Sequence, residues 1–303
     1  MSANIYISGI RGFVGGNIEK HLQNQYRIKG VSRSRDYLSY DELSVSHLNN
    51  SHAFIHLAGK AHDLKNSSDS SEYFKVNTEL TKKLYDVFLS SNCKIFIYMS
   101  SVKAVADSVS GKLIEDIIPA PKTAYGKSKL EAENYILQHL PKDREVFILR
   151  PCMIHGPGNK GNLNLLYSFV KKGVPFPLGK YNNQRSFLNI DNLNFVISEI
   201  LQLNVKKGVY NVSDSETLSI NQLVKAIGEA NNNKTRVVKI PKWIMSLIAK
   251  AGDNFSFIPL NSEKLQKLTE NYIVDNSKLL KALKKPLPIT VTQGVIKTIK
   301  NFG

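Results

Sequence analysis

Three glycines near the start of the chain constrain the fold more than any other feature of the sequence. Gly9, Gly12 and Gly15 follow an apolar run at 4–8 and precede a helix-like run at 13–23. In a strand–turn–helix unit, the first glycine allows a tight turn, the second lets the backbone approach a pyrophosphate, and the third lets helix and strand pack closely. Free N–H groups at the helix start attract phosphate. This stretch predicts a dinucleotide-binding loop, and a glycine-rich turn without a ligand is the alternative.

Strand-like and helix-like runs alternate through the first half of the chain. The strand-like runs are short, rich in Ile, Val, Phe and Tyr, and nearly continuous in apolarity; they lie at 4–8, 27–32, 53–59, 94–101 and 145–151. The helix-like runs lie at 13–23, 72–91 and 125–140. Continuous apolarity is typical of strands buried on both faces, and the alternation predicts parallel strands with right-handed crossovers. The predicted fold class is therefore α/β, a Rossmann-type doubly wound parallel sheet.

The character of the sequence changes after Pro151. Gly and Pro become frequent, helix-like runs dominate, and one clear late strand follows at 208–214. We expect residues 1–158 to form mainly the dinucleotide-binding domain. Residues 159–303 are expected to form mainly a smaller, mixed substrate-binding lobe, with some chain returning to the first domain.

The charge balance narrows the choice of partners. The chain of 303 residues has 41 Lys and Arg against 25 Asp and Glu, a formal net charge of +16. The cations are scattered, and no basic run is longer than two residues. The excess therefore favours anionic small molecules over nucleic acid.

Several features indicate a cytoplasmic protein. Cys93 and Cys152 lie in apolar stretches and are expected to be buried thiols, which suits a reducing compartment. No apolar run approaches the ~20 residues that span a bilayer, and residues 1–4 lead into a strand pattern without a signal peptide. The apolar stretch 240–252, with Lys near both ends, is expected to pack into the core, with weak binding to an anionic membrane surface as the alternative. We predict no stable membrane insertion and no metal site.

The end of the second predicted strand indicates which dinucleotide binds. A site that prefers NAD usually has Asp or Glu there to hold the ribose 2′-hydroxyl. This chain has Ser32 and Arg33, then Arg35, while Asp36 follows past the expected strand end. Guanidinium groups suit a 2′-phosphate, and Arg11 in the glycine loop can approach the same region. The sequence favours NADP(H); NAD(H) is the alternative if Arg33 and Arg35 are solvated loop charges.

Two further segments supply groups for acid–base chemistry. Tyr125 and Lys129 are four residues apart in a predicted helix, so they share a face. A phenol has a pKa of about 10, and a neighbouring ammonium lowers that pKa, which makes a tunable proton donor and acceptor. Ser100 and Ser101 end the fourth predicted strand, at the sheet edge where α/β proteins bind ligands. We predict Ser101, Tyr125 and Lys129 as catalytic residues, with Ser100 in support; a surface pair and a strand-capping turn are the alternatives.

Eight segments, taken in their order and spacing, resemble the extended short-chain dehydrogenases/reductases, in the nucleotide-sugar epimerase/dehydratase branch of that family. They span nearly the whole chain: GIRGFVGG, HLAGKAH, FKVNTELTKKL, SSVKAV, AYGKSKLEAE, LRPCMIHGPG, RSFLNIDNL and YNVSD. The C-terminal lobe resembles that of the UDP-N-acetylhexosamine 4-epimerases and 4-ketoreductases of polysaccharide gene clusters. The resemblance also leaves a homodimer open.

The resemblance implies roles for individual residues. The implied cofactor-binding residues are Gly9, Arg11, Gly12, Phe13, Val14, Gly15, Ser32, Arg33, Arg35, Leu57, Ala58, Gly59, Asn77, Ser100, Tyr125, Lys129, Pro151, Met153 and Ile154. The residues expected to hold the nucleotide-linked sugar are Ser101, Lys103, Asn162, Leu163 and Arg185.

The resemblance further implies a reaction at C4 of a nucleotide-linked sugar, with a UDP-sugar as the expected substrate. No Asp-Glu pair of the 4,6-dehydratase kind follows Ser101, which disfavours dehydration. Arg11 resembles the loop arginine of GDP-fucose synthases, which use NADPH, but the Cys with which those enzymes epimerise is missing beside the serines. We predict an NADP(H)-dependent 4-ketoreductase of surface polysaccharide synthesis. A UDP-sugar 4-epimerase with tightly bound NAD and a catalytically silent dinucleotide-binding protein are the alternatives.

Overall fold

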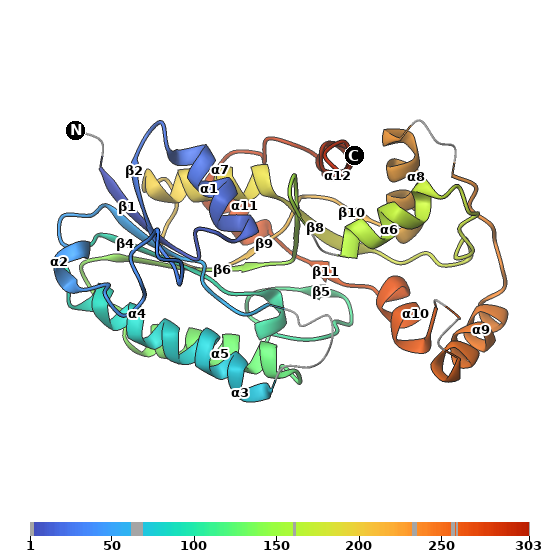
Figure 1. Ribbon diagram of the computed structural model, residues 1–303, viewed down its shortest axis with the longest axis horizontal. Coiled ribbons are helices and arrows are strands. Elements are labelled where there is room, and N and C mark those ends of the chain that lie inside the picture. The colour runs from blue at the N-terminus through green and yellow to red at the C-terminus, as the bar shows by residue number, and fades with distance from the viewer. Residues whose placement is uncertain are drawn as a thin grey trace.

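A six-stranded parallel sheet forms the centre of the larger lobe (Figure 1). The computed structural model describes residues 3–61, 69–159, 162–231, 235–255, 258 and 260–302, without the side chains of Asn162 and Leu165. The strands follow the spatial order β2-β1-β3-β4-β6-β9, and every neighbouring pair is parallel. Their bounds are β1 Asn4–Ser8, β2 Arg27–Val31, β3 Ala53–His56, β4 Ile95–Met99, β6 Glu145–Pro151 and β9 Gly208–Val212. The predicted α/β class and parallel sheet are confirmed.

Alternate side chains of each strand lie in different cores, which explains the continuous apolar runs of the sequence. Ile5 and Ile7 pack with α1, α7 and α11 on one face of the sheet. Tyr6 packs with α2, α4 and α5 on the other face, and Figure 1 shows α4 and α5 side by side beneath the sheet. The bounds are α1 Phe13–Leu22, α2 Val45–Leu48, α4 Leu80–Leu89, α5 Ala124–Gln138, α7 Ile190–Leu201 and α11 Ser277–Leu283. Helices on both faces are typical of parallel sheets.

The direction in which the chain adds strands reverses at β1. The chain runs from β1 to β2 on one side and then to β3 on the other side of β1. Such a reversal opens a crevice outside the carboxyl ends of the strands, where ligands bind in open α/β sheets. These ends are Ser8 in β1, His56 in β3, Met99 in β4 and Pro151 in β6. The segments predicted to bind the cofactor follow these ends.

A second hydrophobic core forms the smaller lobe. Five helices pack there around a mixed sheet of three strands in the order β10-β8-β7. The bounds are β7 Met153–His155, α6 Asn162–Lys171, β8 Arg185–Asn189, β10 Thr217–Leu218, α8 Ile220–Ala230, α9 Lys242–Asn254, α10 Ser262–Thr269 and α12 Val291–Ile299. Since α7, β9 and α11 pack on the larger sheet, chain from the C-terminal half does return there. The division at residues 158 and 159 stays a prediction.

Two short segments far apart in the sequence lie side by side between the lobes. β5 (Lys112–Leu113) pairs in parallel with β11 (Ile273–Val274). Tyr272, directly before β11, donates its hydroxyl to the Ala106 carbonyl at 2.7 Å. This pairing ties the loop after β4 to the C-terminal part of the chain.

The helix predicted over 72–91 contains a π-helical turn. α3 (Ser70–Tyr73) leads into the π-helix η1 (Phe74–Glu79), which continues as α4. Single π-helical turns within helices are frequent at functional sites because they change which side chains face a ligand. This turn includes Asn77.

The helix predicted in the stretch 240–252 forms as α9. The prediction that it packs into the core holds for one face of the helix and is wrong for the other. Met245 and Ala249 are buried, whereas Trp243 and Leu247 are 65% and 57% exposed. Only one side of α9 meets the core of the smaller lobe, because the helix lies at the edge of that lobe (Figure 1). In the part of the chain that the structure describes, no helix has the length and apolarity to cross a membrane.

Candidate functional site

The glycine loop forms a cradle at the carboxyl end of β1. Gly9 has a φ of +73°, and a Cβ at this position would lie 2.8 Å from the backbone N of Ala58. A Cβ on Gly15 would lie 2.5 Å from the Gly9 carbonyl oxygen, so helix and turn pack at backbone distance. Within the described residues, α1 begins after Gly12 without a capping side chain and without an acidic residue in its first turn. The first N–H groups and the positive end of the helix dipole therefore fit an anion such as a pyrophosphate.

An arginine of the glycine loop reaches the loop that follows β2. Arg11 Nη1 donates a hydrogen bond to Ser34 Oγ at 2.8 Å. Ser34 Oγ donates to Asp36 Oδ2 at 3.1 Å, and Ser34 N donates to Ser32 Oγ at 3.0 Å. Asp36 is the first acidic residue after β2, and its carboxylate accepts the hydrogen bond from Ser34. A guanidinium lies at the strand end where a site that prefers NAD has a carboxylate.

The other two arginines predicted for the cofactor are exposed. Burial raises the pKa of Tyr40, and the positive charge of Arg33 opposes that effect. The backbone of Gly9 also opposes it, although burial raises the pKa more than both together lower it. Arg33 and Arg35 both lie exposed on the loop after β2.

Lys129 is a buried ammonium at the centre of the site. Its Nζ donates a hydrogen bond to the Met99 carbonyl at 2.9 Å and lies 4.9 Å from the centroid of the Tyr98 ring. Burial lowers the pKa of Lys129 to about 8, and the negative charge of Glu133 opposes that effect. The lysine thus links α5 to the carboxyl end of β4.

Glu133, one helical turn after Lys129, is fully buried against a cation from β6. Arg150 donates from Nε to both carboxylate oxygens, at 3.1 and 3.0 Å, and from Nη2 to Oε2 at 2.6 Å. Ser100 donates its hydroxyl to the same carboxylate. Neither Glu133 nor Arg150 is among the residues predicted from the sequence, although the i, i+4 spacing of Lys129 and Glu133 is a visible signal.

Tyr125 and Ser101 interact within the candidate site. Their side chains are hydrogen-bonded, which lowers the pKa of Tyr125, but burial raises that pKa by more. The Tyr-x-x-x-Lys spacing predicts a lowered pKa for Tyr125, and this prediction is wrong. The ammonium of Lys129 donates its hydrogen bond to the Met99 carbonyl instead. Tyr125 is accordingly in the protonated form at neutral pH.

Asp107 holds the start of the helix that presents Tyr125. Its Oδ2 accepts from Lys122 N at 2.6 Å, and its Oδ1 accepts from Thr123 Oγ1 at 3.0 Å. Thr123 in turn caps α5 by accepting from Gly126 N at 3.1 Å. Asp107 is therefore a positioning residue for Tyr125, and it too is absent from the predicted set.

Asn77 connects three segments around Lys129. Its Nδ2 donates to Ser128 Oγ and to the Lys60 carbonyl, both at 3.0 Å, and its Oδ1 accepts from Lys60 N at 2.8 Å. A Cβ on Gly59 would lie 3.0 Å from Asn77 Oδ1 and 3.1 Å from Lys129 Nζ. The structure thus brings together Gly59, Asn77 and Lys129, which the sequence predicts separately as cofactor-binding residues.

A neutral histidine braces the strand ends beneath the crevice. His56 Nδ1 lies 2.6 Å from Ser8 Oγ, and His56 Nε2 lies 2.8 Å from Thr81 Oγ1. Burial lowers the pKa of His56 to about 3, with a smaller effect from the charge of Lys129. Because it remains uncharged, His56 joins β1, β3 and α4 without adding a charge to the site.

Two cations predicted to bind substrate lie near each other, although they come from distant segments. Burial lowers the pKa of Lys103, the negative charges of Glu270 and Asp107 oppose that effect, and the positive charge of Arg185 adds to it. Lys103 Nζ donates to the Asp107 carbonyl at 2.6 Å and lies 4.2 Å from the centroid of the Tyr272 ring. Arg185 Nη2 lies 3.8 Å from Glu270 Oε1. This pair of cations suits a diphosphate.

The remaining predicted residues divide between the two cores. Pro151 is buried at the end of β6, and Met153 packs on the core of the smaller lobe. Leu163 is only 2% exposed within that same core, so the structure places it in packing. The side chain of Asn162 lies outside the described residues. Half-buried side chains that pack on the larger core are Phe13, Val14, Leu57 and Ile154.

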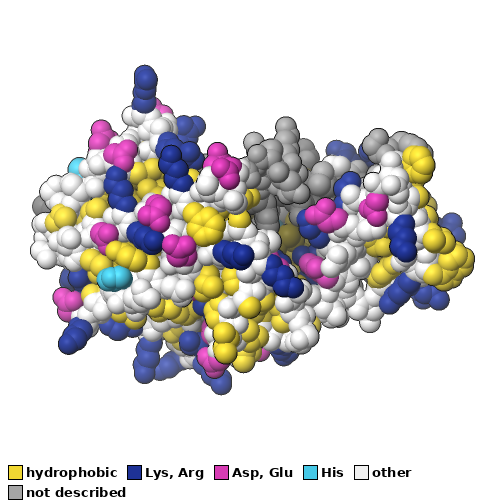
Figure 2. Space-filling model, turned by 90° about the horizontal axis from the view of Figure 1, so that it is seen from below, with side chains coloured by type: hydrophobic (Ala, Val, Ile, Leu, Met, Phe, Trp, Pro, Cys, Tyr) yellow, Lys and Arg dark blue, Asp and Glu magenta, His cyan; other side chains and the backbone are white. Residues whose placement is uncertain are grey.

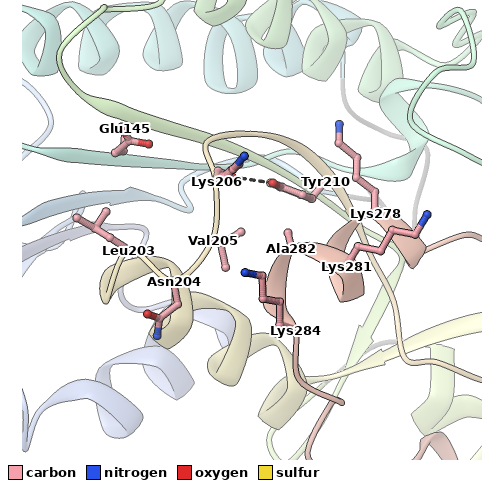
Figure 3. A pocket seen from close by; sticks show the side chains of 10 residues that line it. All are labelled: Glu145, Leu203, Asn204, Val205, Lys206, Tyr210, Lys278, Lys281, Ala282 and Lys284. Atoms are coloured by element: carbon pink, nitrogen blue, oxygen red, sulfur yellow. Dashed lines mark hydrogen bonds between the residues drawn. The ribbon is translucent and has the colours of Figure 1, made fainter.

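A separate hollow lies at the amino ends of β6 and β9, on the opposite edge of the sheet (Figure 3). It has a volume of about 770 Å³. Its lysines, Lys206, Lys278, Lys281 and Lys284, point in different directions (Figure 3). No residue predicted for the site lines this hollow, so it is not part of the candidate site.

Comparison with known proteins agrees with this geometry. The model of the "NAD dependent epimerase/dehydratase family" matches residues 5–213. The chain is 30% identical to the UDP-glucose 4-epimerase of Vibrio cholerae, over 100% of this chain and 96% of that protein. It is 26% identical to the N-acetyl-alpha-D-glucosaminyl-diphospho-ditrans,octacis-undecaprenol 4-epimerase of Escherichia coli O157:H7, over 99% and 95% of the two chains.

A solved structure shares the same fold. The structure of RMD from Pseudomonas aeruginosa complexed with NADPH matches with a TM-score of 0.74 and 20% identity. The match covers 99% of each chain. The shared fold therefore extends over both lobes of this chain.

The buried ammonium of Lys129 should make the stability of the protein depend on pH. In the unfolded chain this lysine keeps its proton up to its ordinary pKa of 10.5, whereas in the folded protein it loses the proton at about 8. Between these values unfolding takes up a proton, so a rising pH favours the folded state. The free energy of unfolding of the wild type should rise by roughly 2 kcal/mol relative to Lys129→Met from about pH 8 to about pH 10, as measured by urea denaturation.

Lys127→Met is the matched control, because Lys127 is exposed on the same helix. Its stability should follow the wild type across this pH range. Parallel curves for wild type and Lys129→Met would mean that the lysine is not titrating near pH 8 in the folded protein.

Proposed function

The chain belongs to the NAD dependent epimerase/dehydratase family, and on this premise we propose that it is an NADP(H)-dependent oxidoreductase. In this proposal it reduces the 4-keto group of a nucleotide-linked sugar, with UDP-sugars as the substrate class. The observation that carries the choice of cofactor is the 2.8 Å hydrogen bond from Arg11 to Ser34. It holds a guanidinium at the end of β2, where a 2′-phosphate would be bound.

The residues around the crevice fit such a cofactor. The N–H groups after Gly12 would bind the pyrophosphate, and Arg11 and Arg33 would bind the 2′-phosphate. Gly59 and Lys129 would border the nicotinamide ribose; they lie side by side, because a Cβ at Gly59 would be 3.1 Å from the ammonium. When bound, NADPH supplies the hydride for the reduction. RMD, which shares the fold, was solved in complex with NADPH, and this supports the assignment.

Tyr125 is the proton donor in this proposal. As the hydride adds to C4, the phenol hydroxyl gives its proton to the carbonyl oxygen, and a secondary alcohol results. Ser101, hydrogen-bonded to Tyr125, orients the same oxygen, and the phenolate regains a proton from solvent. Tyr125, whose pKa is raised by burial, carries at neutral pH the proton that this step requires.

Lys103 and Arg185 bind the diphosphate of the substrate. Both cations follow Ser101 in the sequence, and the positive charge of Arg185 acts on Lys103. Two cations neutralise a diphosphate better than either does alone. This arrangement would leave the sugar ring at Ser101 and Tyr125.

A UDP-sugar 4-epimerase is the second candidate, because the two relatives reported above are named as 4-epimerases. Such an enzyme removes a hydride from C4 and returns it to the opposite face, so it has no net redox change. The same Ser101, Tyr125 and Lys129 would serve it, but Tyr125 would have to act first as a base.

The nucleotide released when the purified protein is denatured separates the two candidates. A reductase exchanges its cofactor each turnover, so we expect little bound NAD and uptake of added NADPH, measured by chromatography of the released nucleotide. Stoichiometric NAD in the extract would instead favour the epimerase.

Tyr125→Phe should lower kcat by about 10²- to 10⁴-fold, because the variant has no proton to donate. The affinity for NADPH, measured by fluorescence titration, should stay within about twofold. Tyr135→Phe is the control, since that hydroxyl lies on the same helix but bonds to Asp86 on the outer side. Near-normal turnover by Tyr125→Phe would refute the assigned role, and a wild type without turnover on any 4-keto or UDP-sugar would identify a silent protein.

Arg11→Ala and Arg33→Ala should each weaken NADPH by roughly tenfold or more and leave NADH almost unchanged, because only NADPH has the 2′-phosphate. Isothermal titration with both cofactors measures the difference. Arg27→Ala is the matched control, an exposed arginine at the opposite end of β2. Equal losses for the two cofactors would contradict the 2′-phosphate model.

A further inference from the structure

Helix α9 has a large apolar face that points away from the protein. Trp243 is 65% exposed, Leu247 57%, Ile248 39% and Phe255, directly after the helix, 54%. Figure 2 shows hydrophobic side chains gathered at this end of the molecule, with Lys and Arg side chains among them. Isolated exposed side chains need no explanation, but a contiguous group of this size marks an interaction surface.

The exposure follows from how α9 is anchored. Met245 and Ala249 are the buried positions of the helix and pack on the core of the smaller lobe. With 3.6 residues per turn, Trp243, Leu247 and Ala251 fall on the opposite side. The anchor and the outer stripe therefore use different faces, and the outer stripe cannot turn inward without removing Met245 and Ala249 from the core.

Cations border the apolar stripe along one side. Lys242, Ser246 and Lys250 are spaced four residues apart, so they form a polar row next to it. Arg236 and Lys239, just before the helix, are also exposed. The one acidic residue of α9 is Asp253, and its two oxygens accept from Ser262 N and Ser262 Oγ at 2.9 and 2.6 Å. On α9 and in the segment just before it, the cations Arg236, Lys239, Lys242 and Lys250 therefore outnumber the single carboxylate.

We propose that α9 docks the smaller lobe on the surface of an anionic phospholipid membrane. An interfacial helix has Trp and Leu on one face and Lys beside it, and its apolar face enters the boundary between headgroups and acyl chains by about 5–10 Å. Its 13 residues span only about 20 Å, too short to cross a bilayer. Trp243 would lie at headgroup level, and Lys242 and Lys250 would contact lipid phosphates.

Charge favours a membrane over a second copy of the chain as the occupant. A formal net charge of +16 makes two copies repel each other, whereas an anionic lipid surface attracts the protein. Lysines are also depleted from protein–protein interfaces, yet they border this stripe. The lipid surface is thus the occupant that matches both the apolar stripe and its rim.

The fluorescence of Trp243 tests the proposal directly, because it is the single tryptophan of the chain. The full-length protein is mixed with vesicles of phosphatidylcholine alone or of phosphatidylcholine with phosphatidylglycerol. We expect a blue shift of the emission and sedimentation with the anionic vesicles, weaker binding to the neutral ones, and a decrease with added salt.

Variants assign the binding to this face while Trp243 remains as the reporter. Leu247→Asn with Ile248→Asn should weaken partitioning to anionic vesicles by roughly tenfold or more. Each of Lys242→Gln and Lys250→Gln should weaken it by about fivefold. Leu140→Asn is the control, a leucine 49% exposed just past α5, and it should bind as the wild type does. All these side chains are exposed, and thermal melts check that folding is retained.

Three results would overturn the proposal. The first is an unchanged Trp243 emission with anionic vesicles. The second is binding to vesicles that the Leu247 and Ile248 changes do not weaken. The third is a blue shift that depends on protein concentration without lipid, which would identify a second copy as the occupant.

Discussion

The burial of one ammonium group, that of Lys129, determines how the catalytic side of the sheet is assembled. A charge in a protein interior is costly unless other groups compensate it. Lys129 is compensated by the Met99 carbonyl and by Glu133, and Glu133 is itself buried only together with Arg150 and Ser100. These contacts hold α5 against β4 and β6, and Tyr125, one turn earlier on α5, is held at Ser101 as a result.

The reacting groups lie between two regions that suit anions. On one side, the start of α1 lacks a capping side chain among the described residues, and Arg11 extends from the glycine loop to Ser34. On the other side, Lys103 and Arg185 come from distant segments, and the positive charge of Arg185 acts on Lys103 together with the charges of Glu270 and Asp107. In our proposal the first region holds a dinucleotide and the second a nucleotide sugar. The excess of cations in the chain then binds two phosphorylated ligands. The lysines beside the apolar stripe of α9 bind a lipid surface.

The strands, and the helix face that Tyr125 and Lys129 share, could be predicted from the sequence because their signals are local. Continuous apolar runs predict buried strands, and Tyr125 and Lys129 share a helix face through their spacing alone. The π-helical turn at Asn77 could not be predicted, because the apolar period of 72–91 is that of an ordinary helix. Glu133 and Arg150 could not be paired either, since their contact joins a helix to a strand. The many apolar residues of α9 resemble those of a core helix until the neighbours of each face are known.

By itself, the sequence determined the parallel α/β sheet, the glycine loop at its edge, and the presence of Ser101, Tyr125 and Lys129 near one another. Spacing and apolar periodicity are properties of residues near one another in the sequence, so they can be recognised without knowledge of the fold. Only the tertiary structure decided the protonation of the site: burial raises the pKa of Tyr125, and the pKa of Lys129 falls to about 8. It also decided that one face of α9 meets solvent. Desolvation and charge–charge interaction depend on distances through space, and the linear sequence does not contain them.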